Sequence, residues 1–136
     1  MELITTSVGS KRLKSADLLI YGTCAGTEEP EKLKELTAGK IVLTTCLEKV
    51  HMDMAGFKLA TIMAVSKPKS VTVVTMDGSP HCVQLHLAAE QAKALTAAAT
   101  RIEHYVFEKG KLCRVSSEAV KAARHLSAIQ EMLDKD

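Results

Sequence analysis

Three of the four cysteines in this chain stand where β-rich runs of the sequence end. They are Cys24 after residues 18–21, Cys46 after residues 41–45, and Cys82 beyond residues 71–76. The thiolate form of cysteine binds soft metals and attacks electrophiles. Thiols from three separate loops can therefore hold a metal ion or an iron–sulfur cluster, whereas a single activated thiolate can act as a nucleophile or redox group.

The three runs are nearly continuous in apolar or β-branched residues, as strands buried on both faces of a sheet are. Helical patterns alternate with the runs, and this order predicts a parallel sheet joined by right-handed crossovers. The carboxyl ends of parallel strands share one edge, where open sheets bind ligands at the topological switch point. We therefore expect the three cysteines to converge on that edge.

An iron–sulfur cluster normally takes four thiolates, so a fourth ligand is needed. Cys113 is the remaining thiol, and it reaches the same edge if its strand packs beside the third one. His81 is the alternative fourth ligand, and His51 and His86 are the other histidines nearby in the sequence. The chain has no Cys-x-x-Cys pair, which excludes a zinc ribbon and a thioredoxin motif.

The first functional hypothesis is therefore a small redox protein that binds an iron–sulfur cluster or another thiolate-ligated metal. Its metal ligands are predicted to be Cys24, Cys46, Cys82 and Cys113. Its role is electron transfer to a larger redox partner.

The second hypothesis is an enzyme in which Cys82 acts alone on a small anionic substrate. Cys82 lies at or just before the start of the third predicted helix, where the helix dipole and free N–H groups favour a thiolate. His81 or His86 can pair with this thiol and activate it. His86 also precedes Glu90 by four residues, so these two can instead form an ordinary pair on the helix surface.

The third hypothesis is a binding or assembly protein without catalysis, in which the cysteines are only packed. Free cysteine is among the most buried residue types and often behaves as a small apolar side chain. This interpretation applies best to Cys113, whose neighbours Leu112 and Val115 are apolar.

Two glycine-containing loops follow the first and third predicted strands. Gly78 permits a positive φ and Pro80 presets φ, which shapes a tight turn before a helix. Such a turn can cradle an anion at the helix N-terminus, and a plain connection fits equally well. The candidate cofactor-binding residues are Gly22, Thr23, Gly78 and Ser79. The G-x-G-x-x-G order and the lysine of a phosphate loop are missing, so we expect neither dinucleotides nor nucleoside triphosphates as ligands.

The layout of these cysteines resembles the small α/β delta subunit of methanogen-type hydrogenases. The likeness rests on Cys24-Ala25-Gly26, on Cys46, and on Gly78-Ser79-Pro80-His81-Cys82. Proteins of that family pass electrons through an iron–sulfur cluster to heterodisulfide reductase, and the resemblance implies that Cys24, Cys46 and Cys82 are cluster ligands. The family has paired cysteines near the first and third strands, where this chain has one each, and the resemblance does not supply Cys113.

The elements that position these residues form a single predicted α/β domain over residues 1–136. We expect a three-layer, doubly wound, mainly parallel sheet, followed by a β-hairpin that adds antiparallel edge strands around residues 108–111, and by one closing helix after Ser116. Apolar residues at helical spacing predict the buried helix faces. These are Phe57, Ala60, Met63 and Ala64; then Val83, Leu87, Ala88, Ala92 and Leu95; and finally Val120, Ala123, Leu126, Ile129 and Leu133.

The amino-acid composition limits the classes of binding partner that we expect. Aromatic residues make up only 3% of the chain and the net charge is only +2, which argues against binding nucleic acid. No apolar run reaches the roughly 18 residues of a membrane span, and the N-terminus lacks the pattern of a signal peptide. We therefore expect a cytoplasmic protein with reduced thiols. An uncovered edge strand favours a homodimer.

Overall fold

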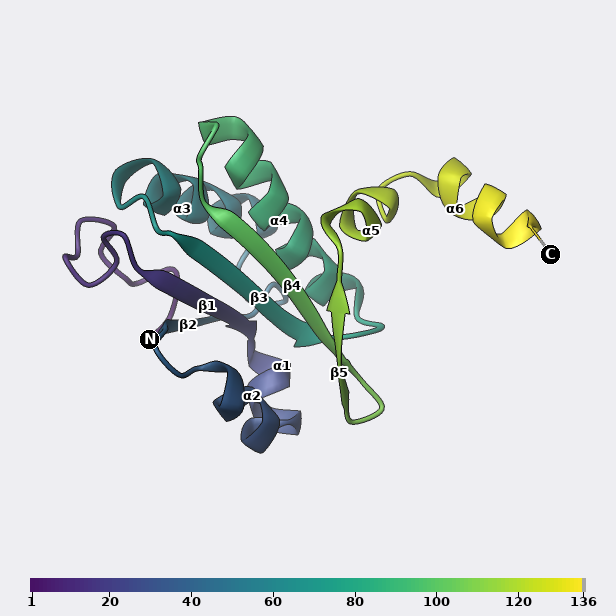
Figure 1. Cartoon of the computed structure of the whole chain (residues 1–136), viewed down its shortest axis with the longest axis horizontal. Coiled ribbons are helices and arrows are strands. Elements are labelled where there is room, and N and C mark those ends of the chain that lie inside the picture. The colour runs from purple at the N-terminus through teal and green to yellow at the C-terminus, as the bar shows by residue number, and fades with distance from the viewer. Residues whose placement is uncertain (136) are drawn as a thin grey trace.

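A five-stranded sheet forms the middle layer of the computed structural model, which describes residues 1–135 (Figure 1). The strands are β1 (Asp17–Gly22), β2 (Ile41–Thr45), β3 (Ser70–Met76), β4 (Arg101–Glu108) and β5 (Lys111–Val115). Their order is β2-β1-β3-β4-β5, and only β5 runs antiparallel to its neighbour. The chain leaves β1 for β2 on one side and returns to β3 on the other, so the switch point lies between β1 and β3.

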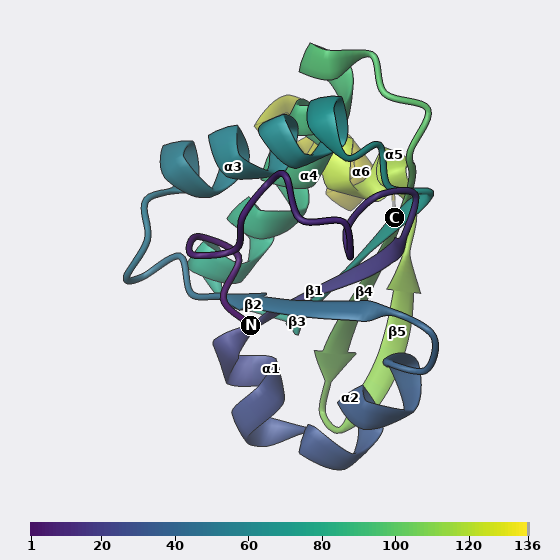
Figure 2. The same ribbon diagram turned by 90° about the vertical axis from the view of Figure 1, so that its left-hand side faces the viewer.

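Helices cover both faces of this sheet, which confirms the predicted three-layer α/β fold. The helices are α1 (Thr23–Glu28), α2 (Pro30–Leu36), α3 (Met52–Val65), α4 (Pro80–Thr96), α5 (Ser117–Ala122) and α6 (Leu126–Asp134). Figure 2 shows α1 and α2 on one face and α3 and α4 on the other. Among residues 1–135, no helix combines the length and the apolar character that a bilayer crossing requires.

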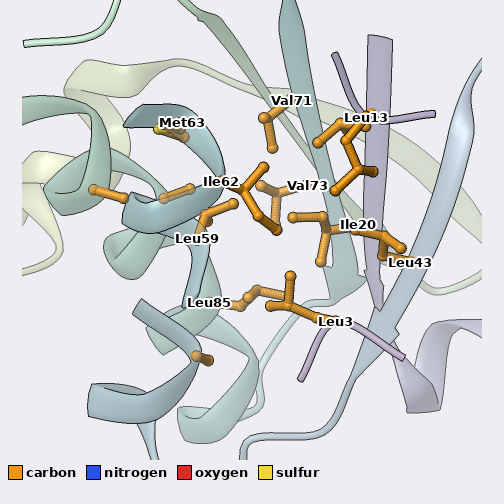
Figure 3. Close-up of a cluster of buried hydrophobic side chains, with 14 residues drawn as sticks. Leu3, Leu13, Ile20, Leu43, Leu59, Ile62, Met63, Val71, Val73 and Leu85 are labelled. Carbon is orange, nitrogen blue, oxygen red and sulfur yellow. The ribbon is translucent and has the colours of Figure 1, made fainter. Parts of the chain in front are cut away.

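The larger core lies between the sheet and the helices α3 and α4 (Figure 3). Ile20 and Val73 point toward this face from adjacent strands and meet Leu59 and Ile62 of α3. The N-terminal segment completes the core with Leu3, whose backbone N–H donates to the carbonyl of Thr44 on β2. Side chains of alternate strand residues pack on the opposite face against α1 and α2, because successive residues of a strand point to opposite sides.

The predicted hairpin is present, but its first strand, β4, runs parallel to the neighbouring strand of the sheet and not antiparallel as predicted. β4 is parallel to β3 and begins where Arg101 pairs with Ser70, so only β5 adds an antiparallel edge. The physical reason is that α4 returns the chain to the starting edge of the sheet, which makes β4 a fourth parallel strand. The local sequence of a strand carries no signal for this direction.

The predicted closing helix is in fact two short helices, α5 and α6. α5 ends at Ala122 and α6 begins at Leu126, and Val120 alone of the predicted apolar stripe is buried. No residue of Leu126–Asp134 is buried.

The helices α3 and α4 also bury different faces from the ones predicted. Phe57 and Leu95 were expected in the core, but their side chains are 77% and 71% exposed. The buried residues of these helices are Ala55, Leu59, Ile62 and Met63 in α3, and Leu85, His86, Ala88, Ala89 and Ala92 in α4. Apolar residues surround most of both helices, so their spacing does not identify the face that meets the sheet.

Candidate functional site at the carboxyl edge of the sheet

The three strand-end cysteines lie at the carboxyl edge, each in the connection after its strand. Cys24 is the second residue of α1, Cys46 directly follows β2, and Cys82 is the third residue of α4. Burial raises the pKa of the Cys24 thiol, and the thiolates of Cys82 and Cys46 raise it further, as does Glu48. Cys82 and Cys46 therefore both lie within electrostatic reach of Cys24.

The first turn of α4 lies directly over the end of β1, at the switch point. A methyl group placed on Gly22 would lie 3.8 Å from the Cys82 Sγ and 3.6 Å from the Thr75 Cγ2. Ser79 fixes this turn, because its Oγ accepts a hydrogen bond of 3.2 Å from the backbone N–H of Cys82. Gly78 supplies the required positive φ of +88°. Gly22, Gly78 and Ser79 thus form the surroundings of the Cys82 thiol.

Thr23, the remaining residue of the predicted cofactor-binding set, lies on the β2 side of this edge. Its hydroxyl oxygen is 3.4 Å from that of Thr44. Both line a cavity of about 400 Å³ at the ends of β1 and β2, together with Cys46 and the ammonium-bearing Lys49.

The structure does not bring Cys113 to the other thiols. Cys113 is exposed on β5, and β3 and β4 separate this strand from β1. At the usual strand spacing, that separation is about 14 Å. Within residues 1–135, no three or more side chains of the types His, Cys, Asp and Glu gather closely enough to hold a metal ion.

His81 is the second residue of α4, and His51 is the last residue of the loop between β2 and α3. The His81 Nδ1 is 3.7 Å from the Glu48 Oε1, and about half of the side chain is exposed. His51 is exposed and precedes the first residue of α3. His81 therefore lies next to the thiol edge, through its neighbour Cys82 and through its contact with Glu48.

His86 lies in the interior and belongs to a continuous hydrogen-bonded chain. Its Nε2 is 2.7 Å from the Thr75 Oγ1, and its Nδ1 is 2.8 Å from the Nδ1 of His104. The His104 Nε2 is 2.7 Å from the Glu90 Oε2, which also accepts a hydrogen bond of 2.8 Å from the Ser117 hydroxyl. His86 and Glu90 are thus joined through His104, and the expected surface pair between them is not formed.

The carboxylate of Glu90 sets the direction of every hydrogen bond in this chain. Burial alone would raise the pKa of Glu90, but hydrogen bonds from His104 and Ser117 outweigh burial and hold that pKa below its ordinary value. His104 donates from Nε2, so its Nδ1 accepts the N–H of His86. Burial lowers the pKa of His86 to about 3, aided by His104, so His86 is neutral and its Nε2 accepts the Thr75 hydroxyl proton.

This buried chain, named here the histidine relay, consists of Thr75, His86, His104, Glu90 and Ser117. It leads from Thr75 near the end of β3 to Ser117 at the start of α5. The sequence contains one indication that His104 faces the interior. Alternation along β4 places it on the same face as the apolar Ile102.

Comparison with known proteins yields a family match over almost the whole chain. Residues 10–135 match the model of a family described as a Rossmann-like domain. No curated protein and no solved structure matches the chain. The match agrees with the doubly wound sheet and does not bear on the resemblance to a hydrogenase delta subunit, which stays a prediction.

Proposed function

Because the chain belongs to the Rossmann-like domain family, whose architecture binds ligands at the carboxyl edge of the sheet, we propose that its strand-end thiols bind an iron–sulfur cluster used in electron transfer. One observation carries the proposal. Thiols from three separate strand-to-helix connections lie at one edge of the sheet, and Cys82 and Cys46 add to burial in raising the pKa of Cys24.

The donor set supports a cluster more than a single ion. A single ion needs all of its ligands at one point, and residues 1–135 offer no such group. In a cluster of four irons each iron binds one thiolate, so the ligands stand farther apart than around a single ion. Its positive irons would also relieve the mutual repulsion of the three thiolates.

In this proposal Cys24, Cys46 and Cys82 hold the cluster, and His81 is the nearest candidate for a fourth ligand. Ser79 keeps Cys82 in place through the first turn of α4. When bound, the cluster supplies one-electron transfer to a larger redox protein.

We expect protein purified without oxygen to contain iron and acid-labile sulfide and to absorb broadly in the visible range. The triple variant Cys24→Ser, Cys46→Ser, Cys82→Ser should lose both, because serine does not replace thiolate as a soft ligand. The matched control is Cys113→Ser, which removes the thiol that lies away from the edge and should keep the full metal content.

Three results would contradict this proposal. Absence of iron and sulfide after anaerobic purification and reconstitution would reject the cluster. Equal loss in Cys113→Ser would reject the ligand set. Zinc without sulfide would keep a thiolate site and reject electron transfer.

A second candidate function is favoured by the position of Cys82 at the carboxyl edge of the sheet, in the first turn of α4. In this proposal the Cys82 thiolate acts on a small anionic substrate, and the neighbouring His81 takes up the thiol proton.

For this second function we expect iodoacetamide to label Cys82 first in chelator-treated protein at neutral pH, as measured by peptide mapping. His81→Gln should slow the labelling of Cys82 by about tenfold or more, because the amide of glutamine takes no proton. His125→Gln is the matched control, since it replaces an exposed histidine at the start of α6. Slow and equal labelling of all four cysteines would reject this function.

A further inference from the structure

Basic side chains gather at the amino edge of the sheet, opposite the edge that holds the strand-end thiols. Two connections supply them. The turn before β1 carries Lys11, Arg12 and Lys14, and the link from α3 to β3 carries Lys67 and Lys69. All five side chains are exposed, and the surface that they form is named here the basic edge.

Backbone hydrogen bonds join the two connections into one continuous surface. The N–H of Ser15 donates to the carbonyl of Ser66 over 3.0 Å, and the N–H of Lys69 donates to the carbonyl of Ala16 over 2.8 Å. Figure 1 shows both connections at the end of the sheet where β1 and β3 begin. The five cations therefore belong to one surface, although the sequence separates them into two groups.

Buried residues hold the backbone of the basic edge in place. Leu13 is fully buried between exposed basic neighbours, and Pro68 is buried between Lys67 and Lys69. The carbonyl of Pro68 also accepts a hydrogen bond of 2.8 Å from the buried hydroxyl of Thr100. Because the backbone is already fixed, a partner that binds here orders only the side chains.

No acidic group neutralises this surface. Residues 3–16 and residues 54–76 contain neither aspartate nor glutamate. The nearby Asp17 is engaged, because its Oδ1 accepts a hydrogen bond of 2.7 Å from the Ser70 hydroxyl. Within the described part of the chain, none of the five cations forms a salt bridge. The carboxyl end of α3 attracts Lys67, but the other four cations lie outside that helix.

A cavity of about 580 Å³ opens beside Lys67 and Lys69. Its walls include Ala64 at the end of α3 and residues 97–99 of the link from α4 to β4, which are all alanine. Small apolar walls next to two ammonium groups suit a side chain that has an apolar stem and a carboxylate at its tip.

We propose that the basic edge docks an acidic protein surface, one of whose carboxylate side chains enters this cavity. Single-stranded nucleic acids and lipid surfaces are bound through exposed aromatic or large aliphatic side chains, and neither connection has one. A chain with a net charge of only +2 lacks the strong positive charge of a duplex-binding domain. Complementary charge also steers an acidic partner to this edge.

This docking leaves the thiol edge free. The central strand β3 has seven residues and separates the two edges by about 23 Å. A partner at the basic edge therefore does not cover Cys82, and the inference does not depend on whether the thiols bind a cluster.

Fluorescence anisotropy of a labelled poly-glutamate peptide tests this proposal on the full chain. We expect the wild-type protein to bind the peptide at about 100 mM salt and to lose affinity as salt rises. The triple variant Lys14→Glu, Lys67→Glu, Lys69→Glu should weaken binding at least tenfold, because it places like charges against the peptide.

The matched control reverses three exposed cations on other surfaces, and so makes the same change in net charge. It is Lys34→Glu, Lys111→Glu, Arg124→Glu. Charges farther away than the Debye length of about 10 Å are largely screened, so the control should bind within about threefold of the wild-type protein. Circular dichroism should show that both triple variants keep the fold, because the substituted side chains are exposed.

Four results would overturn the proposal. No binding of the peptide by the wild-type protein would reject the docking surface. Equal weakening in the two triple variants would show an effect of net charge alone. Tighter binding of duplex DNA, or of vesicles that contain phosphatidylserine, would assign the basic edge to nucleic acid or to a membrane. Self-association that the first triple variant abolishes, measured by light scattering, would assign it to a second copy of the chain.

Discussion

The substitution His104→Leu is expected to lower the free energy of unfolding by about 3 kcal/mol at pH 7. His104 is only 1% exposed, and it donates to Glu90 and accepts from His86. Leucine fills a similar space but leaves the Glu90 carboxylate without its buried donor and the His86 N–H without an acceptor. A buried polar group that loses its partner costs the folded state its full desolvation penalty.

Urea denaturation followed by circular dichroism measures this loss. The matched control is His125→Leu, because His125 is exposed and its side chain makes no capping hydrogen bond to α6. We expect the control to change stability by less than about 0.5 kcal/mol. A His104→Leu variant as stable as this control would show that the relay is not a stabilising network.

The strand runs and the edge that collects their ends were predictable because both depend on local sequence. Continuous β-branched and apolar runs such as residues 71–76 occur where a strand is buried on both faces, and the α/β alternation then determines a shared carboxyl edge. The direction of β4 depends on where α4 returns the chain. Pairing between Arg101 and Ser70 is a long-range contact that no local pattern contains.

The contact between His86 and His104 was not predictable for a related reason, although alternation along β4 indicates that His104 faces the interior. His86 and His104 are 18 residues apart in the sequence and meet only because α4 packs on β4. The alanine-rich surface of α4 conceals which of its faces is buried, so the sequence is compatible with His86 on the helix surface or next to Cys82. The positions of Cys24, Cys46 and Cys82 can be predicted from where the strands end. The position of His86 depends on which face α4 turns toward the sheet.

Because this face of α4 is buried, His86 makes the free energy of unfolding depend on pH. In the folded chain its pKa is about 3, against an ordinary value of 6.5, chiefly because burial penalises the imidazolium. Between these two values the unfolded chain binds a proton that the folded chain does not. The free energy of unfolding must therefore fall as the pH drops below 6.5, by about 1.4 kcal/mol per pH unit.

We accordingly expect acidification from pH 7 to pH 5 to cost the folded state about 2 kcal/mol through His86. Glu90 adds to this loss at lower pH, because its pKa is also lower in the folded chain and the unfolded chain again binds the extra proton. Urea denaturation at pH 7, 6 and 5 measures the slope. The variant His86→Gln should remove the His86 contribution over this range, since glutamine does not titrate and its amide can still accept the Thr75 hydroxyl. His51→Gln is the control, because His51 is exposed and outside the relay. If the slopes of the wild-type protein and His86→Gln coincide, another group carries the acid sensitivity, and His86 is not held neutral by burial.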